Sequence, residues 1–269
     1  MPLPFLSRKT PFAHALEAYG LENCSLSPKS HALLVGLKAR QDYPFLPLTE
    51  IPKVPRSISF LEAPIQAELV AALMRSPEAK TLEHLFIGTS HDWPGGARSH
   101  DPDDAFNMTA AVSALAGGWL PALTALTLGD MEMLFNGQRL TGTLGDVAPV
   151  FEAAPNLRQL SLTGGYALSR PVRHDRLETL SAEQSDIGCW SDPPDQATIT
   201  HLFSSSLPRL TGLSIHIDSG EDVAFDLPEI FFSGNGFPSL CRIDFNKPDE
   251  NAAARLKAWA TRRGIIWGP

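Results

Sequence analysis

The sequence predicts an α/β fold in which similar units stack into a solenoid, with a parallel sheet along one side and helices or loops along the other. The main observation is a pattern of apolar residues with spacing i, i+3, i+5, which occurs six times. The copies are Leu82-Leu85-Ile87, Leu123-Leu126-Leu128, Leu157-Leu160-Leu162, Leu177-Leu180-Ala182, Leu210-Leu213-Ile215 and Leu240-Ile243-Phe245. In four copies a proline stands two places before the first leucine. Such a recurrence marks units whose apolar edges become buried when neighbours stack.

Each repeat supplies one strand, and the segments between repeats favour helices. The expected strands cover residues 58–60, 82–87, 123–128, 157–162, 177–182, 210–215, 240–245 and 265–267. The expected helices cover residues 64–74, 103–116, 146–154, 194–205, 227–232 and 249–263. Pro64 suits a first helical position, Asp103 or Asp104 can cap the second helix, and Gly117 and Gly118 can end it. Residues 163–176 contain Gly164, Gly165 and Pro171 and predict a loop instead of a helix.

The units are uneven in length. Successive repeats start between 20 and 41 residues apart, and the extra residues follow the strand. Insertions at that place extend loops or convex helices without disturbing the strand ladder.

Residues 1–56 form a separate, proline-rich region, and residues 57–269 form the repeat array with its closing helix and strand. Eight prolines in the first region oppose long helices and central strands. Residues 12–19 can still form a short helix, and residues 32–38 a strand or a buried helix. We expect this region to cap the open end of the stack, because a terminal unit would otherwise expose its apolar face. The alternative is a tail used for binding.

The strand cores LEHLFI, LTALTL, LRQLSL, LETLSA, LTGLSI and LCRIDF resemble those of leucine-rich repeat proteins. With TLEHLFIG, LPALTALTLGDMEM and APNLRQLSLTGG, residues 55–267 are similar to a group of bacterial proteins built from irregular leucine-rich repeats. The resemblance implies a horseshoe-like array and says little about function. The chain lacks the usual Asn or Cys three positions past the last strand leucine, so we expect uneven curvature.

The residues between the apolar positions face the open, concave side of such a sheet. Most of them are small or hydroxylated. The exceptions are the candidate binding residues, namely His84, Phe86, Glu183, His216, Arg242 and Asp244. Among these, Phe86 and Arg242 are the best anchors, because aromatic residues and arginine most often carry interface energy. Ordinary exposed strand residues are the alternative interpretation.

The long loop after the first clear repeat contains Trp93 and runs from His91 to Asp104. Trp93 is a further candidate contact residue. The histidines and aspartates of the loop match neither a helical zinc pair nor a calcium loop. We therefore expect no metal, and no cofactor.

Composition excludes several function classes. The formal net charge is −8, which disfavours a nucleic-acid partner because phosphate binding depends on clustered lysine and arginine. Three scattered cysteines predict neither a disulfide framework nor a zinc site. No run approaches the roughly 20 apolar residues that span a bilayer, and the start does not resemble a signal peptide. We expect a cytoplasmic protein without a membrane partner.

The sequence therefore predicts a non-enzymatic module that binds another protein through its concave face and loops. A narrower alternative is an immunity protein that neutralises a basic toxin. A third is a hydrolase, but there is no Gly-x-Ser-x-Gly motif and no readable nucleophile and base arrangement, so no catalytic residue is assigned.

Overall fold

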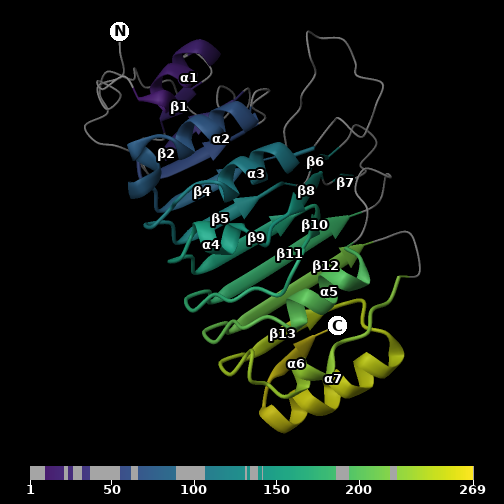
Figure 1. Ribbon diagram of the computed structural model, residues 1–269. Helices are drawn as coiled ribbons and strands as arrows, with labels where there is room; N and C mark the ends of the chain where they lie inside the picture. The colour runs from purple at the N-terminus through teal and green to yellow at the C-terminus, as the bar shows by residue number, and fades with distance from the viewer. Residues whose placement is uncertain are drawn as a thin grey trace.

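The computed structural model describes residues 10–20, 24–26, 32–36, 55–61, 66–88, 107–130, 132–133, 139–140, 142–185, 194–218 and 223–268. Their main feature is one ten-stranded sheet in which strand order follows chain order (Figure 1). The strands are β1 (Cys24–Leu26), β2 (Ala32–Val35), β3 (Ser57–Phe60), β4 (His84–Ile87), β5 (Ala125–Leu128), β9 (Gln159–Thr163), β11 (Thr179–Ser185), β12 (Gly212–Asp218), β13 (Arg242–Phe245) and β14 (Ile266–Gly268). β1 and β2 are antiparallel, and every other neighbouring pair is parallel.

The repeats are in register across the sheet. The second apolar residue of each repeat pairs with its counterpart in the next, so that Leu126 stands beside Leu160 and Leu213 beside Ile243. The third apolar residues pair in the same way. Because side chains alternate along a strand, all these apolar residues point to one face of the sheet. The alternation predicted from sequence is therefore reproduced strand by strand.

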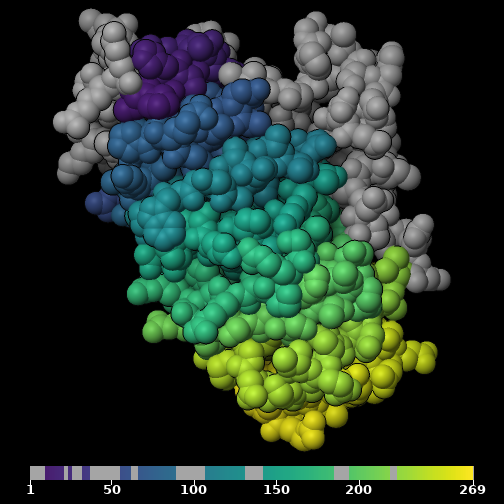
Figure 2. All heavy atoms as spheres, viewed as in Figure 1, coloured from purple at the N-terminus to yellow at the C-terminus, as the bar shows by residue number. Residues whose placement is uncertain are grey.

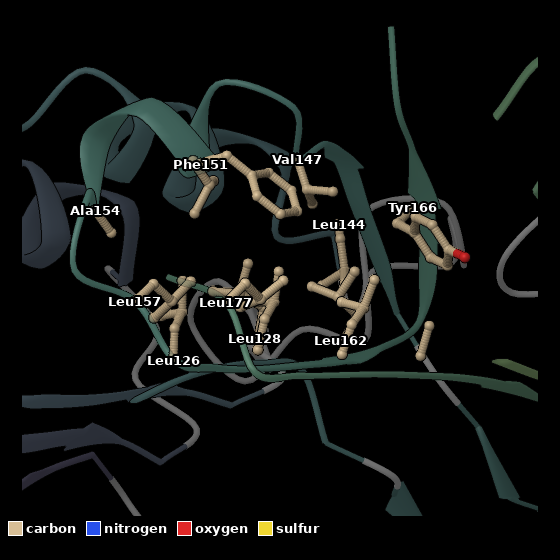
Figure 3. Close-up of a cluster of buried hydrophobic side chains, with 14 of the residues drawn as sticks. Leu126, Leu128, Leu144, Val147, Phe151, Ala154, Leu157, Leu162, Tyr166 and Leu177 are labelled. Carbon is tan, nitrogen blue, oxygen red and sulfur yellow. The ribbon is translucent and has the colours of Figure 1, made fainter. Parts of the chain in front are cut away.

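Helices cover that apolar face. They are α1 (Pro11–Tyr19), α2 (Gln66–Met74), α3 (Thr109–Ala116), α4 (Val150–Ala153), α5 (Gln196–Phe203), α6 (Glu229–Phe232) and α7 (Glu250–Arg263), with the 3-10 helix η5 (Pro77–Thr81) after α2. Their buried side chains join the buried strand residues in one continuous hydrophobic core. In Figure 3, Phe151 of α4 and Val147 lie across from Leu126, Leu128 and Leu162 of the sheet. The described chain is thus a mixed α/β structure with a large, mostly parallel sheet that has helices on one face.

The units succeed one another along the long axis of the molecule. In Figure 2 the colours run in order from α1 at one end to α7 at the other. Each unit therefore packs mainly on its sequence neighbours. At the second end α7 begins at Asp249, whose side chain accepts a hydrogen bond from the Ala252 N–H, and ends at Gly264.

The strands begin two residues later than the repeat motif. The first leucine of each motif lies in the turn before the strand, where one carbonyl oxygen of the preceding unit accepts two N–H groups. The Glu83 oxygen accepts from Thr124 and Ala125, and the Glu178 oxygen accepts from Thr211 and Gly212. The threonine hydroxyls of both turns donate to the same oxygens. This turn fixes the register before the ladder starts.

Two expectations for the segments between strands have clear outcomes. The loop expected at residues 163–176 is confirmed, since it contains no helix and only the short strand β10 (Gly165–Ala167). The helix expected from Asp103 or Asp104 begins instead at Thr109, after Met108, and the Asn107 Oδ1 accepts a hydrogen bond from the Thr109 N–H at 3.0 Å. Residues 89–106 lie outside the described part of the chain.

Part of the proline-rich region continues the sheet. β2 is parallel to β3, and β1 adds to β2 as the antiparallel edge. The α1 helix is held on the next unit by hydrogen bonds from Thr10 Oγ1 to Glu78 Oε1 (3.1 Å) and from the Phe12 N–H to Ser76 Oγ (2.8 Å). These short elements fall between the prolines.

Two small sheets lie beside the main one. β8 (Thr143–Asp146) pairs with β10 in parallel, and β6 (Glu132–Met133) pairs with β7 (Arg139–Leu140) in antiparallel fashion. Residues 129–146 had no strand assignment from sequence. They add a layer at the carboxyl ends of β5 and β9.

Candidate functional site

Among the described residues, none forms a layer over the face of the main sheet opposite the helices, from β3 to β14. Its residues alternate with the buried apolar ones, and each is exposed or half-buried. Parallel sheets are nearly always covered on both faces. An uncovered parallel face of this extent is therefore the first candidate for a binding surface.

Six predicted contact residues lie on this face. His84 and Phe86 are on β4, Glu183 on β11, His216 on β12, and Arg242 and Asp244 on β13. Trp93, the seventh, lies outside the described residues.

The structure places the candidates at two ends of the face. Phe86 and Asp244 occupy the same register row, which runs through Thr127, Ser161 and Ser214. They are five strand steps apart, or roughly 24 Å at about 4.8 Å per step. Phe86 and Arg242 therefore form two separate contact points and not one cluster.

Between these ends the floor consists of small side chains. Its residues are Ala125, Thr127, Gln159, Ser161, Thr163, Thr179, Ser181, Gly212 and Ser214. Gly212 leaves open space, since a side-chain carbon built there would meet only Thr179 Cγ2, at 3.8 Å. The hydroxyls offer donors and acceptors without bulk, so a partner can approach the backbone closely.

At the β4 end, the Phe86 ring folds over Gly88 instead of projecting outward. A side-chain carbon at Gly88 would lie 2.9 Å from Phe86 Cε1 and 3.0 Å from Asp130 Oδ2. The ring is half-buried as a result. It presents an apolar surface that is already ordered.

At the other end the charged residues are arranged across neighbouring strands. Glu183 and His216 are direct register partners. Arg242 Nη2 lies 3.7 Å from Asp244 Oδ2, and the arginine side chain is 67% exposed. At this distance the ion pair is weak, so the Arg242 guanidinium can leave Asp244 and bind an acceptor group of a partner.

The edge of the sheet where the strands begin offers less to a partner because its charges are paired internally. Arg56 Nη1 is 2.8 Å from Glu83 Oε1, and Arg158 Nη1 is 3.2 Å from Glu178 Oε1. In the same row Thr124 and Thr211 donate to backbone oxygens.

The described side chains form no evident metal centre. Within the described ranges, no three His, Cys, Asp or Glu residues are grouped so as to hold an ion. In the same part of the chain, no helix has the length and apolar character needed to cross a membrane.

Two small cavities lie on the helix side. One, of about 250 Å³, is lined by Phe203, Ile230, Phe231 and the Ser233–Phe237 turn. The other, of about 220 Å³, lies between β8, β10 and the start of α5. Tyr166 lines the second cavity and is 5% exposed, and its hydroxyl has no hydrogen-bond partner among the described residues. Leaving such a group unpaired costs about 1–3 kcal/mol.

The sequence did not indicate the second cavity. Tyr166 follows Gly164 and Gly165 just after β9. From the sequence, this glycine-rich segment predicts only a loop. The second cavity also depends on β8 for part of its wall, and the sequence of β8 shows no clear alternation of apolar and polar residues.

Comparison with known proteins yields no relative. The sequence matches no family model and no curated protein, and no solved structure matches the chain.

Proposed function

We propose that this protein is an irregular leucine-rich-repeat solenoid that binds another protein through the uncovered face of its sheet, without being an enzyme. The observation that carries the proposal is the mostly parallel sheet with helices on a single face. Strand order that follows chain order, and repeats in register, support the solenoid assignment.

The chemistry of the face supports a protein partner. Its floor is rich in hydroxyl groups, and Phe86 and Arg242 stand on strands five steps apart. A span of roughly 24 Å corresponds to about 16 residues of helix or 7 residues of strand, so one element of a partner can reach both ends. Small side chains on the floor let that element lie close to the sheet.

The test is capture of a partner from a lysate of the native host with purified protein as bait. A protein retained by the unaltered chain should be lost with the double variant Phe86→Ala and Arg242→Glu. The matched control is the double variant Ile230→Ala and Arg209→Glu, which makes the same kinds of change at exposed positions away from the face. Equal retention by all three baits would contradict the proposal.

The non-enzymatic part has its own test. On the described face, Glu183 and His216 are the adjacent acid and base, and they are where general acid–base chemistry would have to occur. The proposal that the protein is not an enzyme would be overturned if a hydrolase screen found turnover of any substrate and His216→Ala abolished that turnover while the variant still folded.

A further inference from the structure

The second cavity has the features of a small-molecule site separate from the uncovered face. It lies past the carboxyl ends of β9 and β11, between β8, β10 and the start of α5. Its volume of about 220 Å³ is far above the 10–15 Å³ or so that a single water needs, and below the range of about 300–1,000 Å³ for drug-sized ligands. A ligand of a few heavy atoms fits it.

Tyr166 lines the inner side of this cavity, and its hydroxyl is buried behind the cavity wall. Figure 3 shows the Tyr166 ring beside Leu144, with its hydroxyl oxygen pointing away from the labelled leucines. The ring is packed in the hydrophobic core, and the hydroxyl has no hydrogen-bond partner. Burial raises the pKa of this phenol, so the group stays neutral and can both donate and accept.

The outer wall is negatively charged. Asp195 caps α5, and its Oδ1 accepts a hydrogen bond from the Thr198 N–H at 2.7 Å. Hydrogen bonds from Thr198 lower the pKa of the Asp195 carboxyl, so it is ionised at neutral pH. The start of a helix normally favours a bound anion, but at α5 the Asp195 carboxylate already occupies that position.

Within the described part of the chain, the nearby charges do not reverse this sign. Asp146 lies on β8, next to Gly145 of the cavity wall, and it accepts hydrogen bonds from the Ala148 and Ser169 N–H groups. The nearby Arg170 is held by Glu152 at 2.7 Å. His201 of α5 is bound to the Leu168 carbonyl oxygen at 2.6 Å. The cavity thus favours a cation over an anion.

We propose that this cavity binds a small primary amine, whose ammonium group pairs with Asp195 and whose second polar group hydrogen-bonds the Tyr166 hydroxyl. Because the hydroxyl is enclosed, binding includes a small outward shift of the ring toward the ligand. The remaining wall, formed by Gly145, Gly165 and Ala167, leaves room for a chain of two or three carbons.

Three nearly isosteric probes test the charge preference: ethanolamine, ethylene glycol and glycolate. Amide chemical shifts of the labelled protein, titrated to about 20 mM probe, give affinity and location together. Ethanolamine should shift Gly145, Gly165 and Thr198, and should bind up to about fivefold more tightly than ethylene glycol, as one ion pair with the exposed Asp195 carboxylate allows. Glycolate should cause no shift at these positions.

Two conservative variants test the two contacts. Tyr166→Phe removes only the hydroxyl and should weaken ethanolamine binding about fivefold, the worth of one hydrogen bond. Asp195→Asn keeps a good helix cap and should remove the preference for ethanolamine over ethylene glycol.

Folding of Tyr166→Phe is itself informative, because a hydroxyl without a partner contributes nothing to the empty protein. Its melting temperature should equal or exceed that of the unaltered chain. A clear loss of stability, binding of glycolate at the cavity, or no ethanolamine shift at its amides would each overturn the proposal.

Discussion

His174 Nε2 lies 3.0 Å from the Ala154 carbonyl oxygen, while its Nδ1 accepts a hydrogen bond from the Leu177 N–H at 3.0 Å. The imidazole is 3% exposed and held in one neutral tautomer, with the proton on Nε2. The backbone N–H of His174 donates to the Ser206 carbonyl oxygen in the next unit. His174 therefore connects three successive units at the point where the chain between β9 and β11 lacks a helix.

Replacing His174 with alanine should destabilise the fold by about 2–4 kcal/mol. The change leaves the Leu177 N–H unpaired in the core, at about 1–3 kcal/mol for a buried group, removes one of the two hydrogen bonds to the Ala154 oxygen, which the Leu157 N–H still bonds, and opens a cavity beside Phe151. Urea unfolding followed by circular dichroism measures the free energy. A loss below 1 kcal/mol would show that neither bond matters for stability.

The same histidine should make stability depend on pH. Burial lowers the pKa of the His174 imidazole from its ordinary value of 6.5, against a smaller opposite effect of the Ala154 bond. At a pH between the lowered pKa of the folded protein and the ordinary pKa of the unfolded chain, the unfolded chain binds more protons than the folded one. The free energy of unfolding therefore falls as pH drops below about 6.5. Unfolding curves at pH 7.5, 6.5 and 5.5 measure this fall. It should be smaller in His174→Ala, and parallel curves for the two proteins would contradict the assignment.

Two glycines with positive φ should respond differently to alanine. Gly129 has φ +80°, and a side-chain carbon there would overlap the Thr163 carbonyl oxygen. Gly264 has φ +67° and no atom within 4 Å of that position. Gly264→Ala should therefore cost only the backbone strain of about 1 kcal/mol, whereas Gly129→Ala should cost at least about 3 kcal/mol. Equal melting temperatures would mean that β5 and β9 do not approach as closely as described.

The strands were predictable because their signal is local and repeated. A period of two over the last four residues of each motif identifies the buried face of a strand without knowledge of its neighbours, and the helices expected at residues 194–205 and 249–263 carry their own caps, Asp195 and Asp249. The start of α3 was not predictable in the same way, because the N-cap residue is Met108, and the side chain that bonds the first turn comes from Asn107, one residue earlier.

The candidate site was predictable only in part. Alternation along each strand was sufficient to place Phe86, His216 and Arg242 on one face. Their separation across five strands depends on strand order, which a single sequence does not encode locally. The Tyr166 cavity depends on a contact between β8 and β10, about twenty residues apart, and on α5 from a later unit. A contact between such distant segments does not appear as a periodic pattern in the sequence.

The ion pair of Arg158 and Glu178 should contribute little to stability despite its short distance of 3.2 Å. Both side chains are largely exposed, at 53% and 39%. Exposed pairs are worth about 0–1 kcal/mol and are screened by salt. Glu178→Gln should therefore change the free energy of unfolding by less than about 0.5 kcal/mol, and the difference should shrink in 0.5 M NaCl. A larger loss that salt does not change would mean that the Glu178 side chain supports its own turn, whose carbonyl oxygen accepts hydrogen bonds from Thr211.

Two adjacent residues of β11 test which face of the sheet is covered. Ser181 is exposed on the uncovered face, whereas Ala182 is 2% exposed among the core residues. Ser181→Arg should change the free energy of unfolding by no more than about 0.5 kcal/mol, because the guanidinium remains in water. Ala182→Arg should cost more than about 4 kcal/mol, since it places an unpaired charge in the core and overfills it. Chemical unfolding of both variants gives the comparison directly. If Ser181→Arg were the more damaging change, something would cover the outer face of β11, and the binding surface proposed above would have to lie elsewhere.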